Sequence, residues 1–466
     1  MIDCSGNLSP YDLSACVARV FEAAQAKVES LERTWNPEDG APVFTVEGKY
    51  QSRGWTEWTQ GFQFGSQLLV FDGTGSERFL RMGRRNTIEH MASHVTHTGV
   101  HDHGFNNIST YGNLHRFIRE GRIDESPDML RFLEMALKAS GAVQASRWST
   151  IHDGTGFIHS FNGPHSLFVD TIRSCRSLTL AHQLGHVLRI ENDEAVSLLR
   201  RAHEHIDNTA QYNVYFGEGR DTYDVPGRTA HESIFNLTDG QYRCPSTQQG
   251  YSPFTTWTRG LAWAILGAAE QLEYFSTVEE DELTDFTTAL GRMWEATSDF
   301  FIKNTPPDGI PYWDTGAPGL AQIPDHLDTP ANPHNPHEPV DSSAAAIAAQ
   351  GLLRLGRQLR DRSAVGVRLW QAGLRIATTL MEEPYLCRDP NHQGLLLHSV
   401  YHRPNGWDYV PSRKRVPHNE SCMWGDYHLL ELALYLQRII HEEPYPTFFI
   451  QPEQEEPLKA MRQSGL

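Results

Sequence analysis

The sequence has little of what marks secreted, membrane-spanning or zinc-binding proteins. Its six cysteines are scattered, with no Cys-x-x-Cys pair, so they match neither a disulfide framework nor a zinc site. No window approaches about 18 uninterrupted apolar residues, so we expect no membrane span. The N-terminal residues lack a basic segment followed by an apolar run, so we expect no signal peptide. These absences predict a cytoplasmic protein with reduced thiols.

Positive charge is also scarce. The chain has 40 Lys and Arg against 58 Asp and Glu, a formal net charge of −18. Such an excess of acid argues against nucleic acid or an anionic membrane surface as the main partner. An anionic small substrate would need local cations in its binding cleft to offset this charge.

Helical patterns are abundant, whereas strand patterns are few. The 466 residues include 39% hydrophobic and 10% aromatic residues, ample for a large core. Apolar residues three to four apart predict about twelve helices, and the helical hairpins predict an all-α closed ring, an (α/α)6 barrel forming a single domain over residues 1–466. The predicted helices span residues 10–33, 59–73, 76–95, 105–121, 126–141, 166–185, 192–207, 256–275, 279–302, 341–359, 362–382 and 419–441. The predicted strands are Val43–Val46, Asn213–Phe216 and Leu395–Tyr401.

Two long stretches separate predicted helices. Asn208–Phe254 contains Gly, Pro and polar residues, and Thr305–Pro339 is rich in Pro, Asp and His. Loops of this length in a compact domain are usually functional. We therefore expect both to form walls of a cleft at one mouth of the ring.

The stretch from Thr247 to Ala264, TQQGYSPFTTWTRGLAWA, has the composition of a sugar site. A turn-rich entry containing Gln249 leads to a helix whose first two turns carry Trp257, Arg259 and Trp263. Apolar sugar faces stack on indoles, while hydroxyls and carboxylates need fixed donors. The alternative is that both tryptophans belong to the core and that Arg259 extends to solvent.

Asp102 lies in VHDHGF, before a predicted helix, within a group of four histidines at positions 94, 97, 101 and 103. Imidazoles bind zinc, but the spacing HxxHxxxHxH matches no established zinc pattern. A metal site and a group of solvated or hydrogen-bonded histidines both remain open on the sequence alone.

Asp170 lies in SLFVDTIRSCRSL, early in a strongly apolar run. Burial among apolar residues would raise its pKa and suit a proton donor. The alternative is an aspartate that interacts favourably with a helix N-terminus. Three other candidates carry weaker signals: Trp58 opens an early helix, His231 lies in a long loop, and Asp341 fits a helix cap.

Six segments in order, HDHGF, FVDT, QQGY, TWTRGLAW, DSSAAAIAAQGLLRL and ESCMWGDYHLLELALYL, resemble the unsaturated glucuronyl hydrolases, glycoside hydrolase family 88. The resemblance extends from about Trp58 to Leu436 and implies an (α/α)6 barrel. It matches the family's two functional carboxylates to Asp102 and Asp170. It matches the substrate-binding residues to Trp58, His101, His231, Gln249, Trp257, Arg259 and Trp263. The chain departs from the family at Leu261, Gln63 and Leu68, where glutamine or tryptophan is common, and these changes bear on substrate preference.

The resemblance implies a substrate with a 4,5-unsaturated uronic acid at its non-reducing end. Such a sugar contains a C4=C5 vinyl ether, whose hydration needs a proton donor and a base but no metal or other cofactor. We assign proton donation to Asp170 and sugar binding to Asp102. Three alternatives stay open: an unsaturated rhamnogalacturonyl hydrolase, a two-carboxylate glycosidase acting directly at C1, and a non-enzymatic carbohydrate-binding protein.

A basic group, Arg413, Lys414 and Arg415, lies six to eight residues after Trp407. One reading is a solvated basic loop. The other is that it lines the subsite for the downstream sugar and favours a sulfated one.

Overall fold

The helices form two concentric rings in the computed structural model, which describes residues 1–54, 57–275, 277 and 284–463. The inner ring contains α2 (Gln60–Thr74), α5 (His103–Asn107) with α6 (Asn113–Arg119), α8 (Thr171–Ser174) with α9 (Arg176–Gln183), α11 (Thr258–Phe275), α13 (Ser342–Leu359) and α15 (Met423–Ile440). The outer ring contains α1 (Ser14–Thr34), α3 (Glu77–His90), α7 (Pro127–Ser146), α10 (Leu198–Asn213), α12 (Thr284–Lys303) and α14 (Ala364–Leu380). This is the (α/α)6 barrel that the sequence predicts.

The inner and outer helices differ in residue composition. Inner helix α13 is buried along most of its length, and its run from Ala344 to Ala349 is fully enclosed. Small side chains let neighbouring helices approach closely, and a Cβ on Gly351 would lie 2.9 Å from the backbone nitrogen of Leu266 on α11. Outer helices such as α3 bury one face only, as expected for amphipathic helices. Asp341 caps α13, as the sequence predicts, because its Oδ1 accepts from the amide of Ser343 at 3.1 Å.

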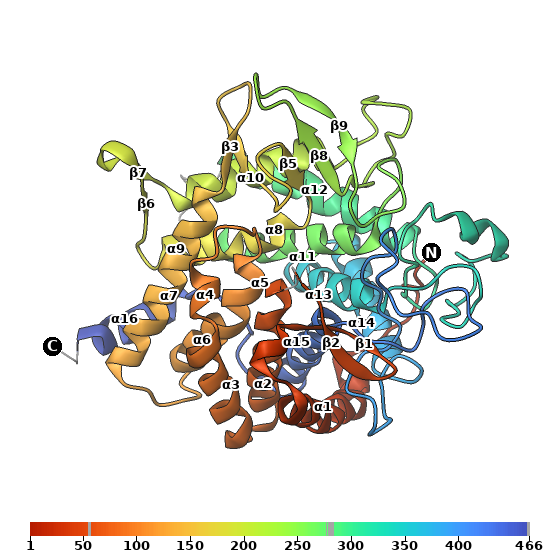
Figure 1. The fold of residues 1–466 in the computed structure, drawn as a ribbon, viewed down its shortest axis with the longest axis horizontal. Helices are drawn as coiled ribbons and strands as arrows, with labels where there is room; N and C mark the ends of the chain where they lie inside the picture. Colours follow the sequence, from red (N-terminus) through yellow and green to blue (C-terminus); the bar gives the residue numbers. More distant parts are fainter. Residues whose placement is uncertain (55–56, 276, 278–283, 464–466) are drawn as a thin grey trace.

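Short strands lie at one end of the barrel. β5 (Ser166–Phe168), β8 (Glu232–Phe235) and β9 (Tyr242–Ser246) form an antiparallel sheet in the order β5-β8-β9. Figure 1 shows this sheet at the edge of the molecule opposite α1, α2 and α3. The remaining short elements are β1 (Pro42–Val46), β2 (Lys49–Ser52), β3 (Trp148–Thr150), β4 (Gly156–Ile158), β6 (Leu188–Arg189), β7 (Ala195–Val196), α4 (Ala92–Val95) and α16 (Pro452–Gln463).

Several sequence predictions of local structure are wrong. The predicted helix 166–185 begins as strand β5 and becomes helical only at Thr171, because its first residues pair with β8. The predicted strand Asn213–Phe216 contains only an isolated bridge, and Leu395–Tyr401 likewise contains only bridges. The loop Asn208–Phe254 holds the end of α10 and two strands of the sheet. Residues 279–283 of the predicted helix 279–302 lie outside the described residues.

A buried charge cluster joins the last inner helix to the first. Asp72 on α2 accepts hydrogen bonds from Arg116 of α6 at 2.6 Å and from Arg438 of α15 at 2.8 Å. Arg122 approaches the same carboxylate at 2.8 Å. Burial raises the pKa of Asp72, but the three guanidinium groups more than offset it, so the pKa is lowered. The carboxylate therefore links three inner segments where the ring closes.

Replacement of Asp72 by Asn should destabilise the fold, because it leaves buried arginines without their counter-charge. We expect the free energy of unfolding to fall by about 3–5 kcal/mol in a urea titration. The lowered pKa makes this contribution present above the carboxyl's unfolded pKa and lost as pH falls through its folded pKa. Asp128→Asn is the matched control, since that side chain is 90% exposed beside Arg131 and should change stability by less than about 1 kcal/mol. Equal effects of the two substitutions would contradict the role of Asp72.

Candidate active site

Two aspartates stand at the starts of neighbouring inner helices. Asp102 directly precedes α5 and Asp170 directly precedes α8, two residues after strand β5 ends. Neither carboxylate makes a capping hydrogen bond to its own helix. The backbone carbonyls start the helices instead, since the amide of Phe105 donates to the carbonyl of Asp102 at 2.9 Å. Both carboxylates are thus available for other interactions.

His101 lies between the two carboxylates. Its Nε2 is 3.9 Å from Oδ1 of Asp102 and 3.7 Å from Oδ2 of Asp170. The imidazole is almost fully buried, and neither ring nitrogen has a hydrogen-bond partner among the described residues. Burial lowers the pKa of His101, but the two aspartates outweigh burial and raise it. The arrangement favours an imidazolium shared by two acids.

The pKa values of the two carboxyl groups shift in opposite directions. Burial is the largest influence on each and raises both pKa values. The pKa of Asp102 stays raised, because repulsion from Asp170 adds to burial. The pKa of Asp170 ends below its ordinary value, because its contact with His101 outweighs burial. The sequence analysis predicts a raised pKa for Asp170, whereas in the free protein this pKa is lowered. His101, which lowers this pKa, lies 69 positions earlier in the chain, too far for a local sequence pattern to reveal the contact.

Asp170 retains one unused oxygen. Its Oδ1 is buried and accepts no hydrogen bond from the described residues. Leaving a buried carboxylate oxygen without a donor is costly in a folded protein. An atom in this state is well suited to exchange a proton with a ligand.

His231, immediately before β8, is held as a neutral donor. Its Nδ1 accepts from the amides of Gln248 at 3.0 Å and Gln249 at 3.3 Å. An accepting Nδ1 places the proton on Nε2. Burial lowers the pKa of His231 to about 4, which keeps the ring uncharged at neutral pH. The Nε2 is buried with no acceptor among the described residues, so it can donate to a sugar oxygen.

Arg259 is buried rather than extended into solvent, so that part of the sequence alternative is wrong, whereas Trp257 and Trp263 both belong to the core cluster, as the alternative held. Its Nη1 contacts Oδ2 of Asp341 at 3.0 Å, and its Nη2 donates to Oε1 of Gln249 at 2.7 Å. The guanidinium also lies 4.6 Å from the ring of Trp257 and 4.9 Å from that of Trp424. The ion pair with Asp341 offsets its charge, and the hydrogen bond fixes the orientation of the Gln249 amide.

The predicted tryptophans occupy different environments. Trp257 lies 4.5 Å from the ring of His231. Trp58 is half-buried and stacks on Trp424 at 5.0 Å and 27°. Trp263 is fully buried between Phe105 at 4.8 Å and a histidine of α15. Trp263 is therefore placed as packing behind the site.

Two residues near the site were missed by the sequence reasoning. Phe161 is 47% exposed, and its ring lies nearly parallel to that of His101, at 6.2 Å and 18°. Phe161 lies in the turn sequence HSFNGPH, which has no periodicity to mark it. Tyr401 accepts a hydrogen bond from the indole of Trp58 at 3.4 Å. Trp424, in the MWGDY segment, is fully buried and belongs to the core behind Trp58.

The four histidines around Asp102 do not converge. His103 contacts Oγ of Ser140 at 3.0 Å and the carbonyl of His97 at 2.9 Å, while His94 contacts the Asn106 amide. Only His101 of the four contacts the two aspartates in the described structure. The described residues contain no group of three His, Cys, Asp or Glu placed to hold a metal ion.

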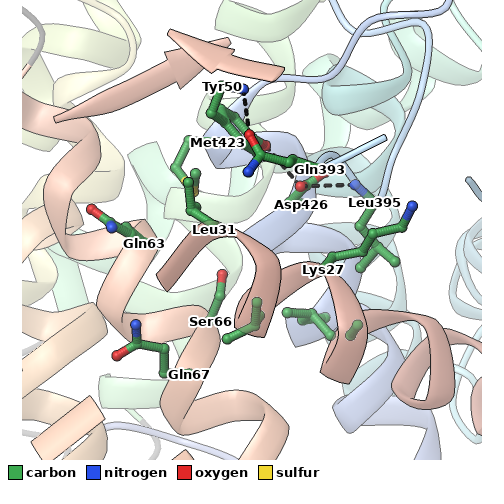
Figure 2. Close-up of a pocket in the computed structure, with 13 residues that line it drawn as sticks. Lys27, Leu31, Tyr50, Gln63, Ser66, Gln67, Gln393, Leu395, Met423 and Asp426 are labelled. Atoms are coloured by element: carbon green, nitrogen blue, oxygen red, sulfur yellow. Dashed lines mark hydrogen bonds between the residues drawn. The ribbon is translucent and has the colours of Figure 1, made fainter. Parts of the chain in front are cut away.

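A separate cavity of about 20 Å³ lies between α1, α2 and α15 (Figure 2). Its lining includes Lys27, Tyr50, Gln63 and Asp426, and none of the candidate site residues. A space of this size holds roughly one water molecule. It is too small for a sugar. Within its lining, the hydroxyl of Tyr50 already donates a hydrogen bond to Oδ2 of Asp426 at 2.7 Å.

Sequence comparisons identify several relatives. The chain is 24% identical over 392 residues to an unsaturated glucuronyl hydrolase of Formosa agariphila, covering 82% of this chain and 81% of that protein. It is 25% identical over 400 residues to an unsaturated glucuronyl hydrolase of Bacillus sp. strain GL1, covering 84% and 89%. An unsaturated chondroitin disaccharide hydrolase of Streptococcus pyogenes is 23% identical over 413 residues, covering 87% of each chain. No protein-family profile matches the chain.

Solved structures share the fold. The crystal structure of the Bacillus sp. GL1 enzyme superposes with a TM-score of 0.67 at 22% identity, covering 92% of this chain and 98% of that one. The unsaturated glucuronyl hydrolase of Streptococcus agalactiae gives 0.69 at 20% identity, covering 95% and 94%. Within the described part of this chain, no helix is long and apolar enough to cross a membrane. By sequence and by fold, the chain is a relative of the unsaturated glucuronyl hydrolases.

Proposed function

We propose that the protein removes a 4,5-unsaturated glucuronic acid from the non-reducing end of lyase-generated oligosaccharides. The observation that carries this proposal is the buried cluster of Asp102, His101 and Asp170, in which one oxygen of Asp170 has no hydrogen-bond partner among the described residues. The names of the relatives support the same substrate class. The main core cluster extends from Ile2 to Leu458, which supports one catalytic domain. All six cysteines are free, which supports a reducing, cytoplasmic location.

The reaction begins at the C4=C5 bond, which is a vinyl ether because C5 bears the ring oxygen. Protonation of C4 by Asp170 places positive charge on C5, where the ring oxygen shares it. The resulting carboxylate of Asp170 then accepts a proton from the water that adds to C5. The hemiketal opens, and the rearrangement that follows expels the aglycone from C1. Each turnover returns the proton to Asp170.

The substrate's own charge prepares Asp170 for this step. Asp170 has a lowered pKa in the free protein because of His101. A bound uronate carboxylate adds a like charge nearby, which raises the pKa of Asp170 and favours its protonated form. Asp102, whose pKa is raised by burial, lies beside His101 and can bind a sugar hydroxyl. His231 and Gln249 add fixed polar groups, while Trp257, Trp58 and Phe161 provide ring faces.

The alternatives use parts of the same site. A glycosidase acting directly at C1 would also need two carboxylates, and a rhamnogalacturonyl hydrolase would differ in the downstream sugar. A carbohydrate-binding protein would need the aromatic faces alone, without a buried pair of aspartates whose pKa values shift in opposite directions. The paired shifts favour an enzyme.

A panel of lyase-generated disaccharides should distinguish the reactions. Hydration removes the conjugated double bond, so we expect turnover to abolish the substrate's ultraviolet absorbance. Saturated glucuronides should be inert, and activity should survive a chelator. Release of the downstream sugar with absorbance intact would instead identify direct hydrolysis at C1. Loss of activity to the chelator, restored by zinc, would restore the metal alternative at the histidine group.

Asp170→Asn should lower kcat by roughly 10²–10⁴-fold with substrate affinity largely kept, because a general acid contributes about that much. Asp102→Asn should also be severely impaired, since it changes both the hydroxyl contact and the charge beside His101. Steady-state kinetics and ligand titration of each variant test this. The exposed Asp128→Asn serves as the control and should match the wild type. A near-normal kcat in Asp170→Asn would show that another group donates the proton.

Arg413, Lys414 and Arg415 are exposed, as a loop facing a charged downstream sugar would require. Changing all three to Gln should raise KM for sulfated disaccharides well above the change for unsulfated ones. The difference should grow at low salt, where screening is weaker. The control is the same change at three other exposed cations, Arg200, Lys303 and Arg360. Equal effects on both substrates, or none, would show that the loop is only a solvated basic surface.

A further inference from the structure

We propose that Gly104 and Ser174 are positioning residues that hold Asp102 and Asp170 at a fixed separation. Gly104 is the second residue after Asp102, and Ser174 is the fourth after Asp170. The two lie where α5 and α8 cross, so their contact joins the helix starts that carry the carboxylates. This inference rests on the proposed function for its kinetic consequences.

Both backbone polar groups of Gly104 bind the segment that follows Asp170. Its amide donates to Oγ of Ser174 at 2.8 Å. Its carbonyl accepts from Nε of Arg176 at 3.0 Å. The first amides of a helix have no partner within that helix, so the bond to Ser174 satisfies a group that α5 leaves open. Gly104 is thereby fixed to α8 and α9 from both sides.

Only glycine fits at this contact. A Cβ at position 104 would lie 2.5 Å from both the Cα and the carbonyl oxygen of Ser174. These are backbone atoms, which cannot turn away as a flexible side chain could. Any larger residue must therefore push the two helix starts apart.

The α8 side of the contact is firmly anchored. Arg173 is buried, and its guanidinium contacts Glu270 of α11 at 3.0 Å and Glu431 of α15 at 3.2 Å. Behind it, a Cβ on Gly267 of α11 would lie 2.9 Å from the backbone nitrogen of Arg173, so α8 has little room to retreat. A clash at Gly104 should therefore move the starts of α5 and α8 apart, with Asp102 and His101 on one side and Asp170 on the other.

That displacement has an electrostatic consequence. His101 is 3.7 Å from Asp170 and adjacent in the chain to Asp102, so it should move with Asp102. Separation removes the His101 contact that lowers the pKa of Asp170, so that pKa should rise. It also weakens the repulsion from Asp170 that helps to raise the pKa of Asp102, so that pKa should fall. The pKa values of Asp102 and Asp170 should therefore become more alike.

The test is Gly104→Ala in the full chain. We expect kcat to fall roughly 10²-fold, since a displacement of about 1 Å can cost that much, with KM changed far less. Carbon-13 titration of labelled Asp carboxyls, assigned with Asp102→Asn and Asp170→Asn, should show the two pKa values converging. Ser174→Ala should move both pKa values in the same direction by a smaller amount. Ser174→Thr, which keeps the hydroxyl, should have pKa values close to those of the wild type.

The matched control is Gly356→Ala. A Cβ there would lie 2.7 Å from the backbone nitrogen and 2.9 Å from the Cα of Trp370, a comparable clash with backbone between α13 and α14, near the end of α13 opposite to Asp341. It should lower the melting temperature as Gly104→Ala does, while leaving kcat and both carboxyl pKa values unchanged.

The outcomes separate the two proposals. Unchanged carboxyl pKa values in Gly104→Ala would overturn the positioning role, as would a kinetic loss no larger than in Gly356→Ala. If Gly104→Ala does not fold, unchanged pKa values in Ser174→Ala overturn the role instead. If the wild type fails to hydrate unsaturated disaccharides, the proposed function fails, whereas converging pKa values would still support the positioning role.

Discussion

Closure of the inner ring is the constraint on which the site depends. The ring closes where α15 meets α2, and Asp72 there holds arginines from α6 and α15. Each inner helix follows an outer helix in the chain, so the inner helices begin at the same rim. Candidate site residues lie at five of those six beginnings: Trp58 before α2, Asp102 before α5, Asp170 before α8, Trp257 before α11 and Asp341 before α13. Closing the ring brings these six helix starts together.

This arrangement also bears on how an acidic protein binds an anionic sugar. Arg259 is the most prominent cation at the rim, yet its guanidinium is paired with Asp341 and hydrogen-bonded to Gln249. Its net attraction for a ligand is therefore smaller than the sequence suggests. Helix starts present the positive end of the helix dipole, and several of them lie on this rim. These dipoles act on a ligand at short range, whereas the charges of distant acids are screened over about 8 Å.

The ring could be predicted from the sequence because about twelve helical patterns in consecutive hairpins suit a closed (α/α)6 barrel, which the family resemblance also implies. It also indicated Trp257 and Arg259 through their spacing in one helix, and the resemblance indicated Asp102 and Asp170. Local patterns could not show that Ser166–Phe168 pairs with β8, because pairing over 66 residues depends on tertiary context. Nor could they show that His101 contacts Asp170 or that Phe161 covers His101. These features arise only when separate helix starts meet.

The protonation of the aspartate cluster completes the electrostatic argument. Burial raises the pKa of Asp102, and the two aspartates raise the pKa of His101 against its own burial. The contact with His101 lowers the pKa of Asp170. A positively charged imidazole between the two acids offsets part of their negative charge, which reduces their repulsion of an anionic substrate. In the proposed reaction, the charge of the bound substrate favours a proton on Asp170, so the aspartate with the lowered pKa would become the donor only in the complex.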